Sequence, residues 1–566
     1  MNDSAAMGTL LSFLRIFEDG DSPALQFIGK WAGKLYQEVP VYFMYIHLLA
    51  AAVFPIFIAA HSSLYQPPSA AKALKDETED EDDEISVQAT TAGLTPSDAI
   101  MFPVTAALLL GGLYFFIKWM GDAKLLNKIM TFYFSGKSTS CHTTKSRAHY
   151  IVYPFLGVFG IAKLLKDCLD FAITFVFPSS WSNGTKTFYI DSQTFQQLIG
   201  KFNEARTSIS DEVLQDKTNP FPGYLSTIKF SPSTTKMLWS IRASFKKHWL
   251  LRGYLHGIFN VKQKVHLNDM IGFVFGLAAI IFYNTNGKAW WVTNLMGFGF
   301  SYGTIQMISP TTFATGSLVL AGLFVYDIVM VFYTPMMITV ATSLEVPIKL
   351  VFPGPKNGSM LGLGDVVLPG MMVALALRFD LYLHYLRKQQ MVPDESRQVP
   401  DKPKEILMKE PYLNPKGLWG DRFWTRNADK ADFTIADGAR FSKVYFKAGI
   451  AGYTIGMIVT LYVCNAFSHA QPALLYLVPG VLIALWGTAF FRNELDPMWE
   501  YTEDGKWGWD NEKQDGESKP SVLGTVAAET EEKQKALNKE ASDHAHHVFL
   551  LSLSEPKHEL SKEKSS

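Results

Sequence analysis

Two aspartates lie inside long apolar segments of this 566-residue chain. Asp327 is the only charged residue of the stretch 311–344, and Asp365 is the only one of the stretch 360–377. A carboxylate near the middle of a membrane is unfavourable by about 2.5–3.5 kcal/mol even on insertion scales, so each acid requires a reason. Two carboxylates that face each other across a pair of helices are the minimal arrangement for aspartic hydrolysis.

The chemistry of such a pair is tightly constrained. Two carboxylates a few ångströms apart in a low dielectric cannot both ionise cheaply, so they share a proton. The ionised member draws a proton from a water held between them, and the protonated member donates to the carbonyl oxygen under attack. This division of labour needs neither metal nor cofactor, and the sequence does not assign the two roles.

Other roles fit the same two acids. Intramembrane carboxylates also serve as proton relays and ion sites in transporters. A pair can also be purely structural when local hydrogen bonds satisfy it. A membrane chaperone that binds substrates without cleaving them is a further alternative. The acids alone do not separate a transporter from a hydrolase.

The composition favours a membrane protein. Apolar residues make up 48% of the chain, and they gather in blocks of about 18–25 residues, the length that crosses a hydrocarbon core. We predict an all-α polytopic membrane protein with about nine transmembrane helices, at 41–61, 99–120, 150–177, 269–286, 289–309, 312–341, 360–386, 443–467 and 471–491. The third is the weakest, because four charged side chains crowd its second half.

Charge and cysteine content exclude other classes. The 52 Lys and Arg nearly cancel the 53 Asp and Glu, which gives no indication of nucleic-acid binding. Three cysteines are too few for a disulfide framework.

Loop charges predict the sidedness of the chain. The loop 178–268 carries 12 Lys and Arg against 5 acids, which favours the cytoplasm. With nine crossings, the N-terminus is then lumenal and the tail cytoplasmic. The predicted parts are a lumenal segment (1–40), three helices with an acidic loop and an atypical insert (41–177), a cytoplasmic loop (178–268), the helices that carry the acids (269–491) with a second cytoplasmic loop (387–440), and a polar, disordered cytoplasmic tail (492–566).

The spacing of the two acids predicts that they meet. Asp327 precedes Met337 by about 15 Å of helix, and Asp365 follows Asn357 by about 12 Å. If both helices cross the lumenal boundary near those points, the two acids lie at similar depth.

Small residues beside the second acid support this arrangement. Gly362 shares a helical face with Asp365 and allows close approach of helices. Gly364 adds backbone freedom, and Pro369 weakens the helix one turn later. We expect a hydrated, slightly opened helix start, as a water-using acid requires.

A third motif opens the last apolar segment, and with it the chain resembles a known family. The motifs are Tyr326-Asp327, Gly362-Leu363-Gly364-Asp365 and Gln471-Pro472-Ala473-Leu474. Together they resemble the signatures of the GxGD intramembrane aspartyl proteases, which include presenilin and signal peptide peptidase. Flanking residues narrow the resemblance to the signal peptide peptidase family, strongly over 265–500 and loosely over 40–180; they include Gly322 to Ile328, Pro347 to Leu350, Gly370, and Arg378-Phe379-Asp380.

The resemblance implies a function and a set of site residues. Members of the family cut transmembrane segments inside the bilayer, among them leftover signal peptides and some tail-anchored or misfolded proteins of the endoplasmic reticulum. The implied catalytic residues are Asp327 and Asp365. The implied substrate-binding residues are Tyr326, Gly362, Leu363, Gly364, Gln471, Pro472, Ala473 and Leu474, with no metal and no cofactor.

The implied surroundings are those of a multi-pass protein of the endoplasmic reticulum membrane. The expected partners are transmembrane-segment substrates, the lipid bilayer, a homo-oligomer and quality-control proteins, and no nucleic acid. Lys562 and Lys564, five and three places from the end, resemble a dilysine retrieval signal.

The third motif also has a physical interpretation. Pro472 lacks an N–H donor, so an extended stretch is expected there, and an unwound substrate could pair with it like an added strand. The alternative is a proline that only starts a helix. Tyr326 either hydrogen-bonds within the site or only packs its ring.

One stretch departs from the family pattern. About twenty residues, 135–153, separate two segments that are adjacent in the family. They either lengthen a loop or are translated intron sequence.

Overall fold

The computed structural model describes the residues 23–71, 92–120, 155–184, 186–191, 195–202, 209–214, 219–255, 259–285, 289–343, 349–353, 359–393, 405–427, 435–467, 471–503 and 549–554. Several predicted features lie outside these ranges: the first 22 residues, most of the acidic loop, the insert 135–153, and the lysines at the chain end.

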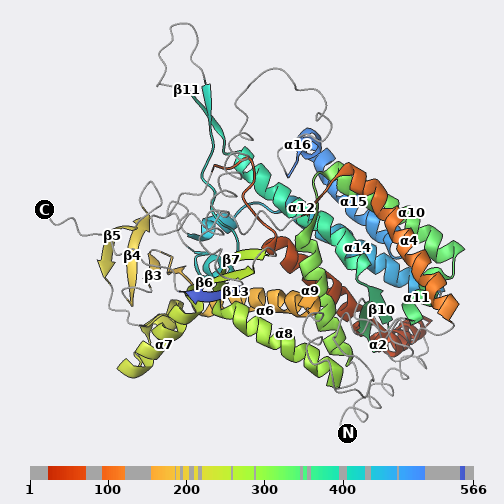
Figure 1. Cartoon of the computed structure of the whole chain (residues 1–566), viewed down its shortest axis with the longest axis horizontal. Coiled ribbons are helices and arrows are strands. Elements are labelled where there is room, and N and C mark those ends of the chain that lie inside the picture. Colours follow the sequence, from red (N-terminus) through yellow and green to blue (C-terminus); the bar gives the residue numbers. More distant parts are fainter. Residues whose placement is uncertain are drawn as a thin grey trace, which may run out of the picture.

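Helices dominate the described structure (Figure 1). They are α2 (Pro23–Ser62), α4 (Pro96–Met120), α6 (Phe155–Val176), α7 (Pro232–Lys246), α8 (Leu267–Thr285), α9 (Trp290–Met307), α10 (Phe313–Ile328), α11 (Met336–Ser343), α12 (Gly364–Leu386), α13 (Trp419–Trp424), α14 (Val444–Phe467), α15 (Leu474–Phe491) and α16 (Leu495–Glu500).

A described helix lies at each of the nine predicted spans. Six are long and apolar enough to cross a membrane: Val41–Ser62, Pro96–Trp119, Phe313–Tyr333, Gly364–Leu386, Val444–Phe467 and Leu474–Phe491. The other three are α6, α8 and α9. The mostly helical membrane fold is therefore confirmed, and the count of nine crossings stays a prediction.

Two charged side chains of α6, Lys166 and Asp167, have partners on neighbouring helices. Lys166 Nζ lies 3.2 Å from Asp269 of α8. Asp167 accepts hydrogen bonds from the hydroxyls of Ser62, at 2.9 Å, and of Tyr302. Neighbouring helices thus supply partners for these two charges, which favours packing of this helix in the bundle.

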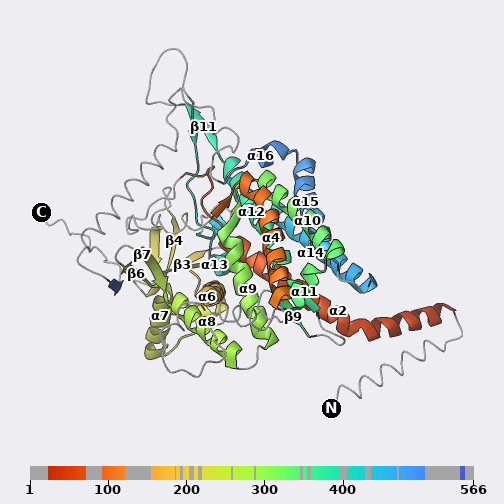
Figure 2. The same ribbon diagram turned by 45° about the vertical axis from the view of Figure 1, so that its right-hand side comes forward.

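Helix α12 is the centre of the bundle. In its most apolar stretch 89% of the residues are buried. It contacts α2, α9, α10, α14 and α15, and it lies among them in Figures 1 and 2. Because α12 carries Asp365, this acid is held by a helix that is surrounded by protein.

Helices α14 and α15 pack with their backbones close together. A Cβ atom on Gly452 would lie 2.4 Å from the carbonyl oxygen of Gly480, and one on Gly480 would lie 2.7 Å from that of Gly452. Small residues permit such close approach in membrane bundles. This pair fixes where α15 begins, and with it the third motif.

The loop 178–268 contains strands, whose presence the sequence analysis did not anticipate. An antiparallel sheet runs in the order β2 (Ser180–Ser182), β3 (Thr187–Asp191), β4 (Gln196–Phe202), β5 (Ile209–Leu214). Trp181, Phe188, Ile190 and Trp239 form its small core. In Figure 1 this sheet and α7 project to the left, away from the apolar helices.

The remaining described strands form four further pairings or sheets. They are β1 (Ala92–Leu94) with β8 (Ile308–Pro310), parallel; β9 (Lys349–Phe352) with β10 (Ser359–Gly362), antiparallel; β11 (Gln390–Pro393) with β12 (Glu405–Met408), antiparallel; and the sheet β13-β6-β7 of Phe549–Ser554, His248–Leu255 and Phe259–His266.

The two loops that were predicted to share a side contact each other. Asp421, in the loop 387–440, accepts hydrogen bonds from the backbone N–H groups of Ser179, at 2.5 Å, and Ser180, at 2.9 Å. Trp424 Nε1 donates to the carbonyl oxygen of Phe175 at 2.9 Å. Both loops therefore lie at one end of the bundle, while the compartment that they face stays a prediction.

The tail differs from the expected disorder in two places. Residues 495–503, which include α16, fold back on the bundle. The side chains of Met498 and Tyr501 are buried there. The strand β13 pairs with β6 over six residues, from Phe549 opposite Leu255 to Ser554 opposite Leu250. In the first stretch, burial of the apolar surface of Met498 and Tyr501 favours the folded arrangement.

The contact between α14 and α15 generates a stability prediction. Gly480→Ala should lower the free energy of unfolding by about 1–3 kcal/mol, because the new methyl group has no space beside Gly452. Gly487→Ala, in the same helix with nothing within 4 Å, is the matched control and should be neutral or stabilising. Thermal unfolding in detergent measures both, and equal shifts would contradict the close packing.

The loop interface generates a pH prediction. Lys246 Nζ donates to Ser179 Oγ at 2.7 Å. Burial, and then the nearby Arg242, lower the pKa of Lys246 to about 7. Between pH 7 and the ordinary lysine value, the unfolded chain binds more protons than the folded one, so stability rises with pH, by at most about 1.4 kcal/mol per unit. Hydrogen exchange of residues 179–190 should therefore slow from pH 7 to 9, after correction for intrinsic exchange.

Two variants test this assignment. Lys246→Met removes the titrating amine and should remove the added pH dependence. Lys247→Met, at the exposed neighbouring lysine, should keep the behaviour of the parent. An unchanged pH dependence in Lys246→Met would refute the role of this amine.

Candidate active site

Asp327 lies in the last turn of α10, and 3% of its surface is exposed. Its Oδ2 accepts a hydrogen bond from the backbone N–H of Leu474 at 3.0 Å. Leu474 is the first residue of α15, where backbone N–H groups have no partner within the helix, and Ala473 provides no side-chain cap. Asp327 therefore caps α15 from another helix and lies at the positive end of its dipole.

A second contact holds the same two helices together. Trp486 Nε1 of α15 donates to Ser317 Oγ of α10 at 3.0 Å. Immediately after Asp327, the backbone changes from α-helix to a π-helical turn over Val329–Tyr333. Such turns occur often at functional sites, because they re-aim side chains within a helix.

Asp365 lies in the first turn of α12, directly after β10. Its carboxylate approaches Gly362: a Cβ atom on that glycine would lie 3.4 Å from Asp365 Oδ2. The hydroxyl of Tyr453, in α14, donates to the backbone oxygen of Asp365 at 3.4 Å. The helix dipole of α12 also favours a negative charge at this position.

The packing of α10 against α12 brings the acids to the same level. The rings of Phe313 and Phe379 meet edge to face, with centroids 5.3 Å apart. Asp327 follows Phe313 by 14 residues, and Asp365 precedes Phe379 by 14 residues. At 1.5 Å per residue, each acid lies about 21 Å along its helix from this aromatic contact. Each acid also lies on nearly the same face of its helix as the phenylalanine that makes the contact. The two carboxylates are close enough for their charges to interact.

The other predicted site residues differ in their exposure. Pro472 and Leu474 are buried, Gln471 and Ala473 are half-buried, and regular helix begins only at Leu474. Leu363 is buried, whereas Gly362 and Gly364 are exposed. Tyr326 is half-buried and packs against the main core, as the packing alternative expects.

A hairpin leads into the second acid motif. Strand β10 pairs with β9, with Gly362 opposite Lys349. The side chain of Asn294, in α9, donates to the carbonyl oxygen of Val351 at 2.9 Å and accepts from its N–H at 2.8 Å. This paired amide contact fixes the hairpin on α9 and so fixes the entry to α12.

Comparison with known proteins decides the family. A family model described as signal peptide peptidase matches residues 86–505. The chain belongs to the signal peptide peptidase family. The matched range contains both aspartates and the motif 471–474.

Individual relatives of this family member match over shorter stretches. Human signal peptide peptidase is 32% identical over 224 residues, 38% of this chain and 45% of that protein. A probable intramembrane protease of Schizosaccharomyces pombe is 33% identical over 232 residues, 40% of this chain and 62% of the relative. Intramembrane protease 2 of Caenorhabditis elegans is 33% identical over 226 residues, 38% of this chain and 39% of the relative. The chain spans about half the length of the relatives that it matches.

Two polar residues near the site of this family member were missed from sequence. Asn294 and Tyr453 lie in predicted spans, and both are buried. An amide inside an apolar segment is itself a signal, because intramembrane polar groups are expensive unless they are paired. The hydroxyl of Tyr453 gives a weaker signal, since tyrosine also packs as an aromatic ring.

The cap that Asp327 provides can be measured without any assay of activity. Asp327→Asn keeps an oxygen acceptor for the N–H of Leu474, whereas Asp327→Ala does not. We expect the asparagine variant to be more stable by about 0.5–2 kcal/mol, the usual contribution of an N-cap. Thermal unfolding of the two purified variants measures this difference.

The same pair of variants at Asp365 is the control. Within the described residues the Asp365 carboxylate accepts no hydrogen bond, so Asp365→Asn and Asp365→Ala should differ less. A larger difference at Asp365 than at Asp327 would contradict the capping role.

Proposed function

We propose that the chain is an intramembrane aspartyl endopeptidase that hydrolyses peptide bonds within transmembrane segments. One observation carries the proposal: Asp327 and Asp365 lie at one level on contacting helices, and Asp327 is bonded to Leu474, the last residue of the 471–474 motif. Membership of the signal peptide peptidase family supports it. A transporter would account for the two acids but not for this third motif beside them.

The proposed mechanism divides acid and base between the pair. Asp327 accepts an N–H hydrogen bond, which favours its ionised form, and we assign it the role of base. It takes a proton from a water molecule whose oxygen bonds to the substrate carbonyl carbon, while Asp365 donates its proton to the carbonyl oxygen. When the C–N bond of the resulting diol breaks, the proton on Asp327 passes to the leaving nitrogen, and Asp365 regains one from a diol hydroxyl.

Substrate must unwind before it can react. A peptide bond in a helix is shielded by its own hydrogen bonds, so a transmembrane substrate has to be extended at the cleavage site. We propose that residues 471–473, which precede the regular helix of α15, offer backbone groups to an extended substrate. Gly362 and Gly364 are exposed beside Asp365 and leave space for a second chain.

We infer that the substrates are leftover signal peptides and tail-anchored or misfolded membrane proteins of the endoplasmic reticulum. The name of the human relative, signal peptide peptidase, supports the first class. Residence in the endoplasmic reticulum membrane is part of the same proposal. A homo-oligomer and quality-control proteins are the partners that we propose beside the lipid bilayer.

Cleavage of a signal-peptide reporter by purified, reconstituted protein tests the proposed function. Asp327→Ala and Asp365→Ala should each lower kcat by at least about 10⁴-fold, because neither acid alone can supply both proton transfers. Asp496→Ala, at an exposed acid of α16, should cleave like the parent. Cleavage that persists in both single variants would refute the mechanism.

A further inference from the structure

The chain turns back over the bundle after its last span. Helix α16 follows α15 (Figure 1), and residues 501–503 then contact the start of α10 and the second half of α12. The ring of Tyr501 contacts Phe313 of α10 at 5.9 Å, and Phe379 and Tyr382 of α12 at 5.3 and 5.0 Å between centroids. These rings surround the aromatic contact that fixes the level of the two aspartates.

Backbone pairing attaches the same residues to the start of α10. Thr502 forms an antiparallel bridge with Thr312, the N-cap of α10. The N–H of Glu503 donates to the carbonyl oxygen of Thr311 at 3.0 Å. The path of residues 501–503 is therefore set by α10.

A buried ion pair attaches these residues to α12. Glu503 lies 2.8 Å from Arg378, and the two side chains are 5% and 3% exposed. Ser309 Oγ donates to Glu503 at 2.8 Å and accepts from Arg378 at 2.6 Å. The guanidinium also lies 5.8 Å from the centre of the ring of Tyr65. Removal of one partner of such a pair leaves an uncompensated buried charge.

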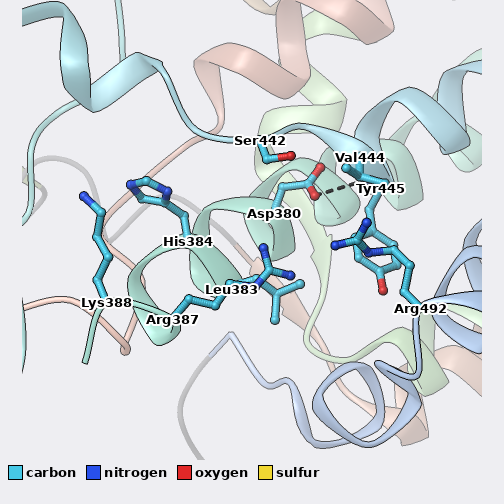
Figure 3. A pocket seen from close by; sticks show the side chains of 9 residues that line it. All are labelled: Asp380, Leu383, His384, Arg387, Lys388, Ser442, Val444, Tyr445 and Arg492. Atoms are coloured by element: carbon cyan, nitrogen blue, oxygen red, sulfur yellow. Dashed lines mark hydrogen bonds between the residues drawn. The ribbon is translucent and has the colours of Figure 1, made fainter. Parts of the chain in front are cut away.

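Other contacts at this end of α12 connect it to different helices. Asp380 accepts from the N–H groups of Tyr445 and Phe446 in the first turn of α14, at 3.1 and 2.9 Å. Figure 3 shows Asp380 directed at that turn, beside a cavity of about 140 Å³. Arg387 lies 2.6 Å from Glu494 at the end of α15. Residues 501–503 instead connect α12 to α10, the other helix that carries an acid.

We propose that Glu503 is a positioning residue for the acid pair, and that residues 501–503 form a C-terminal clamp. Paired with Arg378 and Ser309, the clamp fixes α12 against α10 at a level about 21 Å from both acids. A slip of one helical turn would displace one acid by about 5.4 Å and separate the pair. The catalytic consequence rests on the proposed function, whereas the structural consequence does not.

The first measurement reports the level of the acids without any need for activity. Asp327→Cys and Asp365→Cys are introduced into the full chain after its three native cysteines are changed to serine. Cross-linking with a short thiol reagent is then compared with and without Glu503→Gln. We expect Glu503→Gln to lower the cross-link yield by about threefold or more, because a displacement of an ångström or more along the helices moves the thiols beyond the span of a short reagent.

The second measurement is reporter cleavage by the chain that retains both aspartates. Glu503→Gln should lower kcat by about 10–100-fold, the usual effect of misplacing reacting groups by an ångström. KM should stay within about twofold, because the clamp lies far from the substrate-binding residues. Glu500→Gln, at an exposed glutamate of the same segment, is the matched control and should change neither readout.

A rescue variant separates positioning from loss of the fold. Arg378→Met combined with Glu503→Met replaces the ion pair by apolar groups, an exchange that buried pairs often tolerate. This double variant should recover cross-linking and kcat to within about threefold of the parent, even if Glu503→Gln folds poorly. A double variant that is no better than the single one would overturn the pairing as the cause.

The outcomes distinguish the two proposals. Reduced cross-linking in Glu503→Gln with no cleavage by the parent would support the clamp and refute the protease. Normal cross-linking and normal kcat in Glu503→Gln, with active parent, would refute the clamp and leave the protease intact.

Discussion

Helix ends that lie inside a bundle need partners for their free backbone N–H groups, and much of this structure depends on how that need is met. Helix α15 begins at Leu474, whose N–H is bonded to Asp327. Helix α14 begins one residue before Tyr445, whose N–H, like that of Phe446, is bonded to Asp380. In both cases an aspartate of one apolar helix caps another. Asp327 and Asp380 therefore both help to assemble the bundle. Asp327 is in addition the base of the proposed mechanism.

Two constraints of different range place the acid pair. The local one is the cap of Asp327 on α15, together with the hairpin that leads to Asp365. The distant one is the contact of α10 with α12 near Phe313 and Phe379, which Glu503 reinforces. Because an α-helix is stiff along its axis, a shift of α10 against α12 at the distant contact would displace the acids by almost the same amount. The proposed mechanism, in which two carboxylates share one water, requires both constraints.

The sequence predicted the parts of this structure that depend on local pattern. Apolar blocks located the helices, and two lone acids with a third motif identified the family. What it could not predict depends on partners far along the chain. The charges of α6 made that helix look weak because Asp269, Ser62 and Tyr302 were not known to be beside it. The strands of 178–268 and the fold of 495–503 likewise depend on contacts with distant segments.

Helix α12 carries three carboxylate or guanidinium side chains, those of Asp365, Arg378 and Asp380, and Asp365 differs from the other two in its partners. Arg378 is paired with Glu503 and Ser309, and Asp380 is bonded to two N–H groups. The Asp365 carboxylate, within the described residues, accepts no hydrogen bond and lies near a second acid instead. Helix α12 thus pairs its other two charged side chains with an opposite charge or with N–H donors, whereas the half-buried Asp365 has another acid as its neighbour. Sites that break such a rule are where function is expected, because stability alone would remove them.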